Sequence, residues 1–274
     1  MGRDMQHDSR EIQLGVALVE AADTLSDAFD TGGYLRRLSD HCVDLLGASA
    51  VGIMLVEGGE PMSFGVSSRR QELALDLLEV QRRHQGGPCL ESYGTGEPVP
   101  PVAIRAAHAA CRWPDFTRRA LRYDIAVTFA VPLRRNGTLL GALNVFAPER
   151  AERAGAAEPP GRSESSEPPE SPESGMRIAQ TLADAAAVGL TNHRTYVQYR
   201  TLAGQLQQAL SSRVLIEQAK GMLAERWQTG VDEAFTELRQ YARSNQLPLG
   251  DVAMGVITRR EDASGLGSER PAPS

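Results

Sequence analysis

The sequence predicts an α+β domain, built on an antiparallel sheet with flanking helices, followed by a long helix and a small all-α unit. Three observations support this fold class. Asn136-Gly137 lies between two apolar runs, as in a two-residue β-hairpin. A second apolar run, residues 50–56, ends before Gly58-Gly59 and predicts another pair of strands. No proline occurs from Met176 to Leu247, where apolar residues recur at helical spacing.

The N-terminal segment from Glu11 to Leu46 has helical spacing in two parts. Gly32-Gly33 separates them, so we expect the helix to break there, and we expect Gly47 to end the second part. The apolar positions are Ile12, Val16, Val19 and Leu25, then Leu35, Leu38, Cys42, Leu45 and Leu46.

The central segment alternates strands and helices. We expect strands at 50–56 and 61–66, an amphipathic helix at 69–83 that Gly86-Gly87-Pro88 ends, and a short helix at 113–123. The Asn-Gly hairpin then joins strands 126–133 and 139–146. This order predicts an antiparallel sheet with helices packed on one or both faces.

Residues 148–175 are rich in proline, serine and glutamate and contain almost no apolar residues. Such a segment buries too little surface to offset its ordering entropy, so we expect a disordered acidic insertion. The helix after it, 176–192, is expected to return and cover the sheet.

That helix continues with Tyr199, Leu202, Leu206 and Ala209, which step by three, four and three. This heptad-like spacing predicts a coiled coil between two parallel helices, and therefore a homodimer. The alternative is a single amphipathic helix packed on the protein's own core. Three amphipathic helices follow, and each is too short to be stable alone in water. The first, residues 213–227, either begins at a Ser211 or Ser212 cap or runs on from the long helix.

Composition excludes several classes of protein. The net charge of −6 argues against a chain that coats nucleic acid, although residues 200–260 carry eight Lys/Arg against six Asp/Glu. No apolar run reaches the roughly 18 residues of a membrane span, and the N-terminus lacks the apolar core of a signal peptide. We expect a cytoplasmic protein with no membrane partner. Lys220 is the single lysine beside 28 arginines.

The residues around Lys220 carry a family resemblance. Residues 212–223 are Ser-Arg-Val-Leu-Ile-Glu-Gln-Ala-Lys-Gly-Met-Leu, residues 232–239 are Asp-Glu-Ala-Phe-Thr-Glu-Leu-Arg, and residues 251–253 are Asp-Val-Ala. The segment from Leu210 to Ile257 resembles an ANTAR domain, the RNA-binding module of transcription antitermination regulators.

The upstream region resembles a GAF domain of the kind that precedes ANTAR in actinobacterial regulators. The matching motifs are Gly87–Glu91, Trp113–Phe116, Val131–Leu133 and Gly141–Val145. The resemblance implies a pocket for a small molecule or other signal, which the sequence does not identify, and whether the protein holds a cofactor is unknown from the sequence. The expected domains are a GAF-like sensor (1–198), a coiled-coil helix with the ANTAR domain (199–260) and a disordered tail (261–274).

On this resemblance, four cationic residues are candidates for contact with phosphates and loop bases of hairpin RNA. Arg213 and Lys220 lie seven residues apart on one face of the first ANTAR helix, and Arg239 and Arg243 lie four apart on the second. The alternative for Lys220 is a solvated helix lysine, and the alternative for each arginine is a solvated side chain or one paired with Glu217, Glu225 or Glu237. The small residues Ala219, Gly221 and Ala234 are interpreted as sites of close helix packing.

The sequence therefore predicts a non-enzymatic, signal-responsive regulator that binds two-hairpin leader RNA and prevents terminator formation. One alternative is a thiol enzyme of the GAF type, such as a free methionine sulfoxide reductase, using Cys42, Cys89 or Cys111. Cys89 has no His or Lys nearby in the sequence to activate it, which favours a structural role. A DNA-binding regulator is the other alternative. No catalytic motif or metal-ligand spacing occurs.

Overall fold

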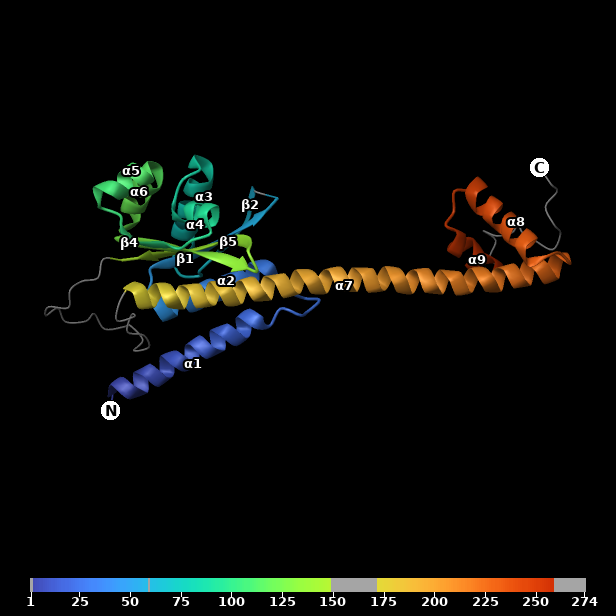
Figure 1. Ribbon diagram of the computed structural model, residues 1–274, viewed down its shortest axis with the longest axis horizontal. Coiled ribbons are helices and arrows are strands. Elements are labelled where there is room, and N and C mark those ends of the chain that lie inside the picture. Colours follow the sequence, from blue (N-terminus) through green and yellow to red (C-terminus); the bar gives the residue numbers. More distant parts are fainter. Residues whose placement is uncertain (1, 59, 149–171, 259–274) are drawn as a thin grey trace. The chain divides into compact units, whose positions relative to one another are not determined.

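The structure, a computed structural model, describes residues 2–58, 60–148 and 172–258 (Figure 1). The chain divides into two compact units, Met1–Thr195 and Tyr196–Ser274. The predicted tail 261–274 and most of the predicted acidic insertion lie outside the described residues.

Unit 1 is built on a five-stranded antiparallel sheet with the strand order β2-β1-β5-β4-β3. Asn136 and Gly137 both have positive φ, 50° and 79°, which confirms the predicted tight hairpin between β4 and β5. The strands are β1 (Ala50–Glu57), β2 (Glu60–Val66), β3 (Val99–Ala103), β4 (Val127–Arg135) and β5 (Thr138–Ala147).

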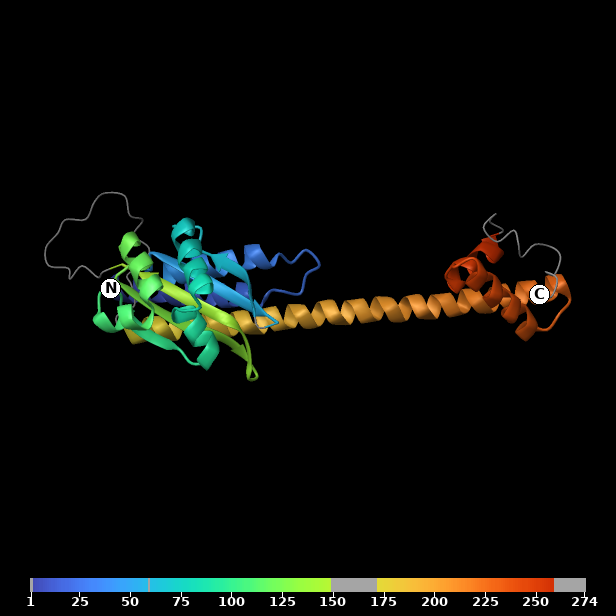
Figure 2. The same ribbon diagram turned by 90° about the horizontal axis from the view of Figure 1, so that it is seen from above.

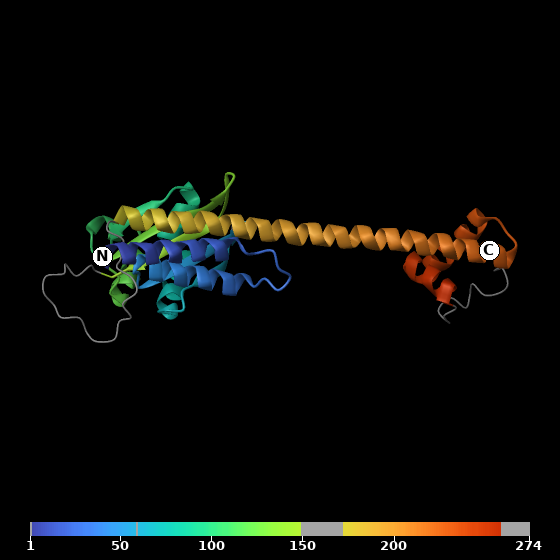
Figure 3. The same ribbon diagram turned by 90° about the horizontal axis from the view of Figure 1, so that it is seen from below.

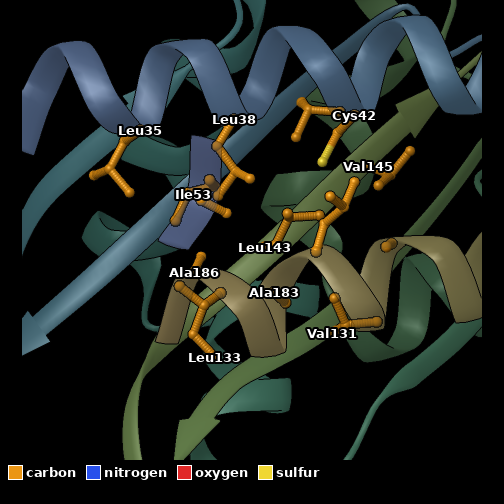
Figure 4. Packing of buried hydrophobic residues seen from close by; sticks show 14 of the residues in the cluster. Leu35, Leu38, Cys42, Ile53, Val131, Leu133, Leu143, Val145, Ala183 and Ala186 are labelled. Carbon is orange, nitrogen blue, oxygen red and sulfur yellow. The ribbon is translucent and has the colours of Figure 1, made fainter. Parts of the chain in front are cut away.

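Helices cover both faces of this sheet (Figure 1). One face carries α1 (Gly2–Ala22), α2 (Thr31–Leu46) and the first part of α7 (Pro172–Trp227), which lie side by side in Figure 3. In Figure 4, α2 and α7 converge on alternate residues of three strands, such as Ile53, Val131 and Leu143. The helix after the acidic segment therefore covers the sheet, as predicted.

The other face carries four shorter helices, seen from above in Figure 2. Its core is separate from the first and includes Met54, Ala142 and Phe146 from the alternate strand positions. The helices are α3 (Gln71–His84), α4 (Pro88–Thr95), α5 (Ala107–Arg112) and α6 (Pro114–Ala120), followed by the 3-10 turn Leu121–Tyr123.

The structure corrects the predicted break at Gly32-Gly33. Both glycines lie in the first turn of α2, where the Asp30 carboxylate accepts hydrogen bonds from their backbone N–H groups at 3.0 and 2.9 Å. A Cβ on Gly33 would lie 2.5 Å from that carboxylate, so the glycine permits the cap rather than ending a helix. The chain break is residues 23–30 instead, whereas Gly47 ends α2 in the left-handed conformation, as predicted.

Unit 2 contains the C-terminal part of α7, α8 (Val231–Ser244) and α9 (Leu249–Thr258). Their buried faces form one small core, which confirms the all-α unit. Helix α7 is continuous from Pro172, four residues before the predicted start, because Pro172 and Glu173 suit a first helical turn. No helix among the described residues is both long enough and apolar enough to cross a membrane.

Candidate functional site

The core of unit 2 fixes the geometry between α7 and α8. Ala219 and Leu223 on α7 and Ala234 and Leu238 on α8 are completely buried. The burial of the two alanines is consistent with close helix packing, as interpreted from the sequence. The neighbouring positions on each helix are thereby held in fixed places at the surface.

Gly221 departs from the packing interpretation. It is exposed, and a Cβ built on it would have no atom within 4 Å. The packing of the described residues therefore does not require a glycine there. Glycine in a helix interior is less favourable than alanine by about 1 kcal/mol, so this position reduces helix stability without a packing reason.

Lys220 is held between α7 and α8. Its Nζ lies 3.0 and 3.1 Å from the two carboxylate oxygens of Glu217, and 5.0 Å from the centroid of the Phe235 ring on α8. The side chain of Lys220 is 13% exposed, whereas that of Glu217 is 58% exposed. In this structure the lysine is thus ion-paired and largely buried, rather than the solvated helix lysine that was the alternative to an RNA contact.

The three candidate arginines are all exposed. Among the described residues, no ion pair or hydrogen bond engages the guanidinium groups of Arg213, Arg239 or Arg243. Their five N–H donors each are therefore available to an external anion.

Helix periodicity brings these residues into two adjoining strips. Arg213, Glu217 and Lys220 occupy positions i, i+4 and i+7 on α7, and Phe235, Arg239 and Arg243 occupy positions i, i+4 and i+8 on α8. The contact between Lys220 and Phe235 joins the two strips. We call these six residues the α7/α8 basic surface. The sequence predicted the four cations and gave Glu217 as a possible ion-pair partner of the arginines, but it did not predict the pairing of Glu217 with Lys220 or the contact with Phe235.

The two buried cysteines of unit 1 are unsuited to thiol chemistry. Cys42 and Cys89 are both completely inaccessible. Burial raises the pKa of the Cys42 thiol to about 12 and raises the pKa of the Cys89 thiol as well. A thiol that stays protonated at neutral pH is a poor nucleophile. Cys111 is exposed.

A buried polar network in unit 1 was missed by the sequence analysis. The Gln81 amide donates to the Asn144 side-chain oxygen at 3.0 Å, and the Gln81 oxygen accepts from the backbone N–H of Cys89 at 2.8 Å. Asn144 in turn donates to Thr128 at 2.7 Å. The signal was available, since Asn144 interrupts an otherwise apolar strand. The network gives Cys89 and Asn144, which belong to two of the GAF-like motifs, an architectural role.

No ligand site in unit 1 is identified by this geometry. A surface hollow is lined by Asp40, Val43, Asp44, Ser68 and Arg69, but the Asp40 carboxylate already accepts hydrogen bonds from the backbone N–H and hydroxyl of Ser68. Within the described ranges, no group of three or more His, Cys, Asp or Glu residues is placed to hold a metal ion.

Several solved structures resemble the chain at low sequence identity and low TM-score. A domain of a putative two-component sensor histidine kinase from Sinorhizobium meliloti 1021 is 15% identical, with a TM-score of 0.43, and the match covers 63% of this chain and 99% of that one. The GAF domain of A. aeolicus nlh2 is 14% identical (TM-score 0.40; 70% and 99% covered). A free methionine-R-sulfoxide reductase from Neisseria meningitidis is 15% identical (TM-score 0.40; 65% and 89% covered). TM-scores this low support no assignment of unit 1.

Comparison with protein families is specific for unit 2. No curated protein matches the chain. The family model "ANTAR domain" matches residues 204–257, which include the last part of α7 together with α8 and α9. The match contains all six residues of the α7/α8 basic surface. Residues 204–257 of this chain are therefore an ANTAR domain, a regulatory RNA-binding module.

Proposed function

We propose that this protein is a signal-responsive regulator that promotes transcription antitermination by binding hairpin RNA in leader transcripts. The observation that carries the proposal is the ANTAR match together with three exposed arginines placed around Lys220. RNA held in the bound hairpins is unavailable to form a terminator. Such a protein acts on nascent transcripts and is accordingly expected in the cytoplasm.

The α7/α8 basic surface suits the chemistry of a hairpin loop. Arginine presents planar, paired N–H donors that match the oxygens of a phosphate. Arg213 on α7 and Arg239 and Arg243 on α8 can contact the backbone on both sides of a loop. The partly exposed ring of Phe235 offers a surface on which an unstacked base can lie. The site thus combines charge with one aromatic ring.

A second copy of the chain is the proposed partner of the exposed face of α7. Five large apolar residues on this face are at least half exposed, from 50% at Leu202 to 69% at Tyr199. They are Tyr199, Leu202, Leu206, Leu210 and Val214. They step by three, four, four and four, so the stripe continues through Leu210 rather than the predicted Ala209. Steps of three, four and four sum to an 11-residue repeat, which favours nearly straight or right-handed pairing over a left-handed coiled coil. Two copies would present two RNA surfaces to two hairpins.

Unit 1 is the proposed sensor, with a GAF-like fold whose signal is unidentified. Helix α7 contributes Ala183 and Ala186 to the core of unit 1, and Ala219 and Leu223 to the core of unit 2. A signal that changes how α7 pairs with a second copy would therefore alter the RNA-binding unit through the same helix.

The test is a gel-shift titration of the full chain with a two-hairpin leader RNA from its own genome. We expect binding that depends on the loops and that Lys220→Ala weakens. In the variant the slope of log K against log[salt] should be shallower by about 0.7, which corresponds to the loss of one phosphate contact on a single strand. Arg200→Ala removes one charge from the same helix outside the surface and serves as the matched control. Equal binding to a scrambled-loop RNA, or an unchanged affinity in Lys220→Ala, would reject the assignment.

The two alternatives have their own outcomes. A thiol reductase requires a reactive cysteine, and the buried, protonated Cys42 and Cys89 do not favour it. Turnover of free methionine sulfoxide that is lost in Cys111→Ser would support it. Binding that duplex DNA competes away as well as hairpin RNA would support a DNA-binding regulator.

A further inference from the structure

We infer that Glu217 is the specificity-determining residue of the α7/α8 basic surface: its carboxylate favours unpaired bases and excludes duplex backbone. This inference rests on the proposed RNA-binding function and goes beyond it, because it assigns selection to an acidic residue within a cationic site.

The geometry places the acid, rather than the lysine, outermost. Both carboxylate oxygens of Glu217 contact the Nζ of Lys220, at 3.0 and 3.1 Å. Glu217 is 58% exposed and Lys220 only 13%, because the ammonium lies between the carboxylate and the Phe235 ring. A phosphate that approaches Lys220 therefore also approaches Glu217.

A duplex presents phosphates to the Glu217 carboxylate, and the carboxylate cannot bind them. Its accessible surface is a line of phosphates, and the Watson–Crick N–H donors of its bases are already paired. The Glu217 carboxylate has no hydrogen to donate to a phosphate and repels it. Repulsive groups of this kind are a common source of specificity.

A hairpin loop presents the complementary chemistry. Its unpaired bases expose amino and imino N–H groups, which a carboxylate can accept with two oxygens. Arg213 lies four residues before Glu217 and Lys220 three residues after it, so the helix presents a cation, an anion and a cation in sequence. That order suits a base flanked by its two phosphates. Next to Lys220, the exposed Gly221 leaves open space for the chain of such a nucleotide.

A structural role does not explain the pair. A helix ion pair between residues three apart typically contributes under about 1 kcal/mol at a surface, and the Glu217 carboxylate is 58% exposed although Lys220 is 13% exposed. Lys220 also retains its contact with Phe235 when the carboxylate is neutralised. Replacing Glu217 with glutamine should therefore leave unit 2 folded, so its effect on RNA can be measured directly.

The experiment measures the affinities of the wild-type chain and of the Glu217→Gln variant for two RNAs. One RNA is the two-hairpin leader, and the other is a blunt duplex of the same stems without loops. We expect the variant to bind the duplex more tightly and the loops less tightly, so that the preference for loops falls on the order of tenfold, the scale of one lost polar contact to a base. The slope of log K against log[salt] for the duplex should steepen by about 0.9, the value for one added phosphate contact on B-form DNA.

Glu225→Gln is the matched control, because it removes the same charge from an exposed position on the same helix. It should leave the loop preference unchanged. If Glu217→Gln keeps the wild-type preference, or weakens both RNAs equally, Glu217 does not select and the inference is overturned, while the proposed function stands. If the wild-type protein shows no loop preference, the proposed function fails first, and the inference falls with it.

Discussion

Gly221→Ala tests whether the exposed glycine in α7 lowers the stability of the ANTAR domain. The glycine lies inside α7, is exposed, and has no atom within 4 Å of where a Cβ would stand. Its φ is not positive, so alanine meets neither a steric nor a conformational obstacle. The substitution should therefore stabilise the domain.

The expected gain follows from helix propensity alone. Alanine is preferred over glycine in a helix interior by about 1 kcal/mol, since the unfolded glycine has more conformations to lose. For a domain of 60–100 residues, that free energy raises the melting temperature by about 4–8 °C. No packing contribution is included in this free energy, because the added methyl group touches no atom among the residues that the structure describes.

Tryptophan fluorescence can isolate the melting of unit 2. The chain has two tryptophans, and Trp227 packs against the core of unit 2 while Trp113 lies in the core of unit 1. In a Trp113→Phe background, thermal unfolding followed at Trp227 reports on unit 2. Gly204→Ala is the matched comparison, since it also adds a methyl group to open space on α7.

A lower melting temperature in Gly221→Ala would refute the reasoning, because it would mean that something packs closely against this position. A higher melting temperature with weakened hairpin binding would locate that close approach in the RNA complex. Gly204→Ala should leave RNA affinity unchanged in either case.

Four further predictions follow from the burial or exposure of particular side chains. Leu223→Ala should destabilise unit 2 by about 2–5 kcal/mol, measured by urea unfolding at Trp227, because its side chain is fully buried between three helices. Leu206→Glu should convert a dimer to a monomer in analytical ultracentrifugation without lowering the melting temperature of either unit; a dimer that persists would place the interface elsewhere. A thiol reagent at pH 8 should modify only Cys111 in the native protein and all three cysteines after denaturation. Because the Cys42 pKa is raised to about 12 from an unfolded value of about 8.5, its contribution to stability is complete below pH 8.5 and is lost progressively as the pH rises toward 12; a urea midpoint that stays constant from pH 8 to 11 would contradict this.

Local patterns predicted the fold where side-chain period and turn chemistry agree. The β4–β5 hairpin was predicted because Asn-Gly suits two successive positive φ angles. Strand β3 was missed, because it contains Pro100-Pro101 and prolines argue against a strand. It lies at the edge of the sheet, where the missing N–H groups cost no ladder bonds. Helix α4 was missed because Gly86-Gly87-Pro88 was interpreted only as a break, although Pro88 also begins the next helix.

In the candidate site, too, the local pattern predicted some features, whereas others depend on tertiary packing. Spacing along each helix placed Arg213 with Lys220, and Arg239 with Arg243, on common faces. Spacing could not show that Lys220 is drawn toward Phe235 and leaves Glu217 outermost, because that contact depends on how α7 and α8 pack. The small size of Gly221 was misinterpreted for the same reason, since sequence alone does not distinguish an exposed glycine from one at a helix contact.

The buried network of Gln81, Asn144 and Thr128 also specifies which strand pairing the chain can accept. In the native sheet Asn144 pairs with Ala130, and its amide points to the α3 face, where every hydrogen bond of the network is made. A slip of β5 by one residue would turn Asn144 to the opposite, aliphatic face and leave its amide without partners. Gln81 extends the same condition to α3, because the Asn144 side-chain oxygen accepts from Gln81 only when α3 docks over β5. Sheets with the wrong strand register are thus higher in free energy because they leave buried amides unpaired, although the apolar residues of β5 alone would be compatible with several registers.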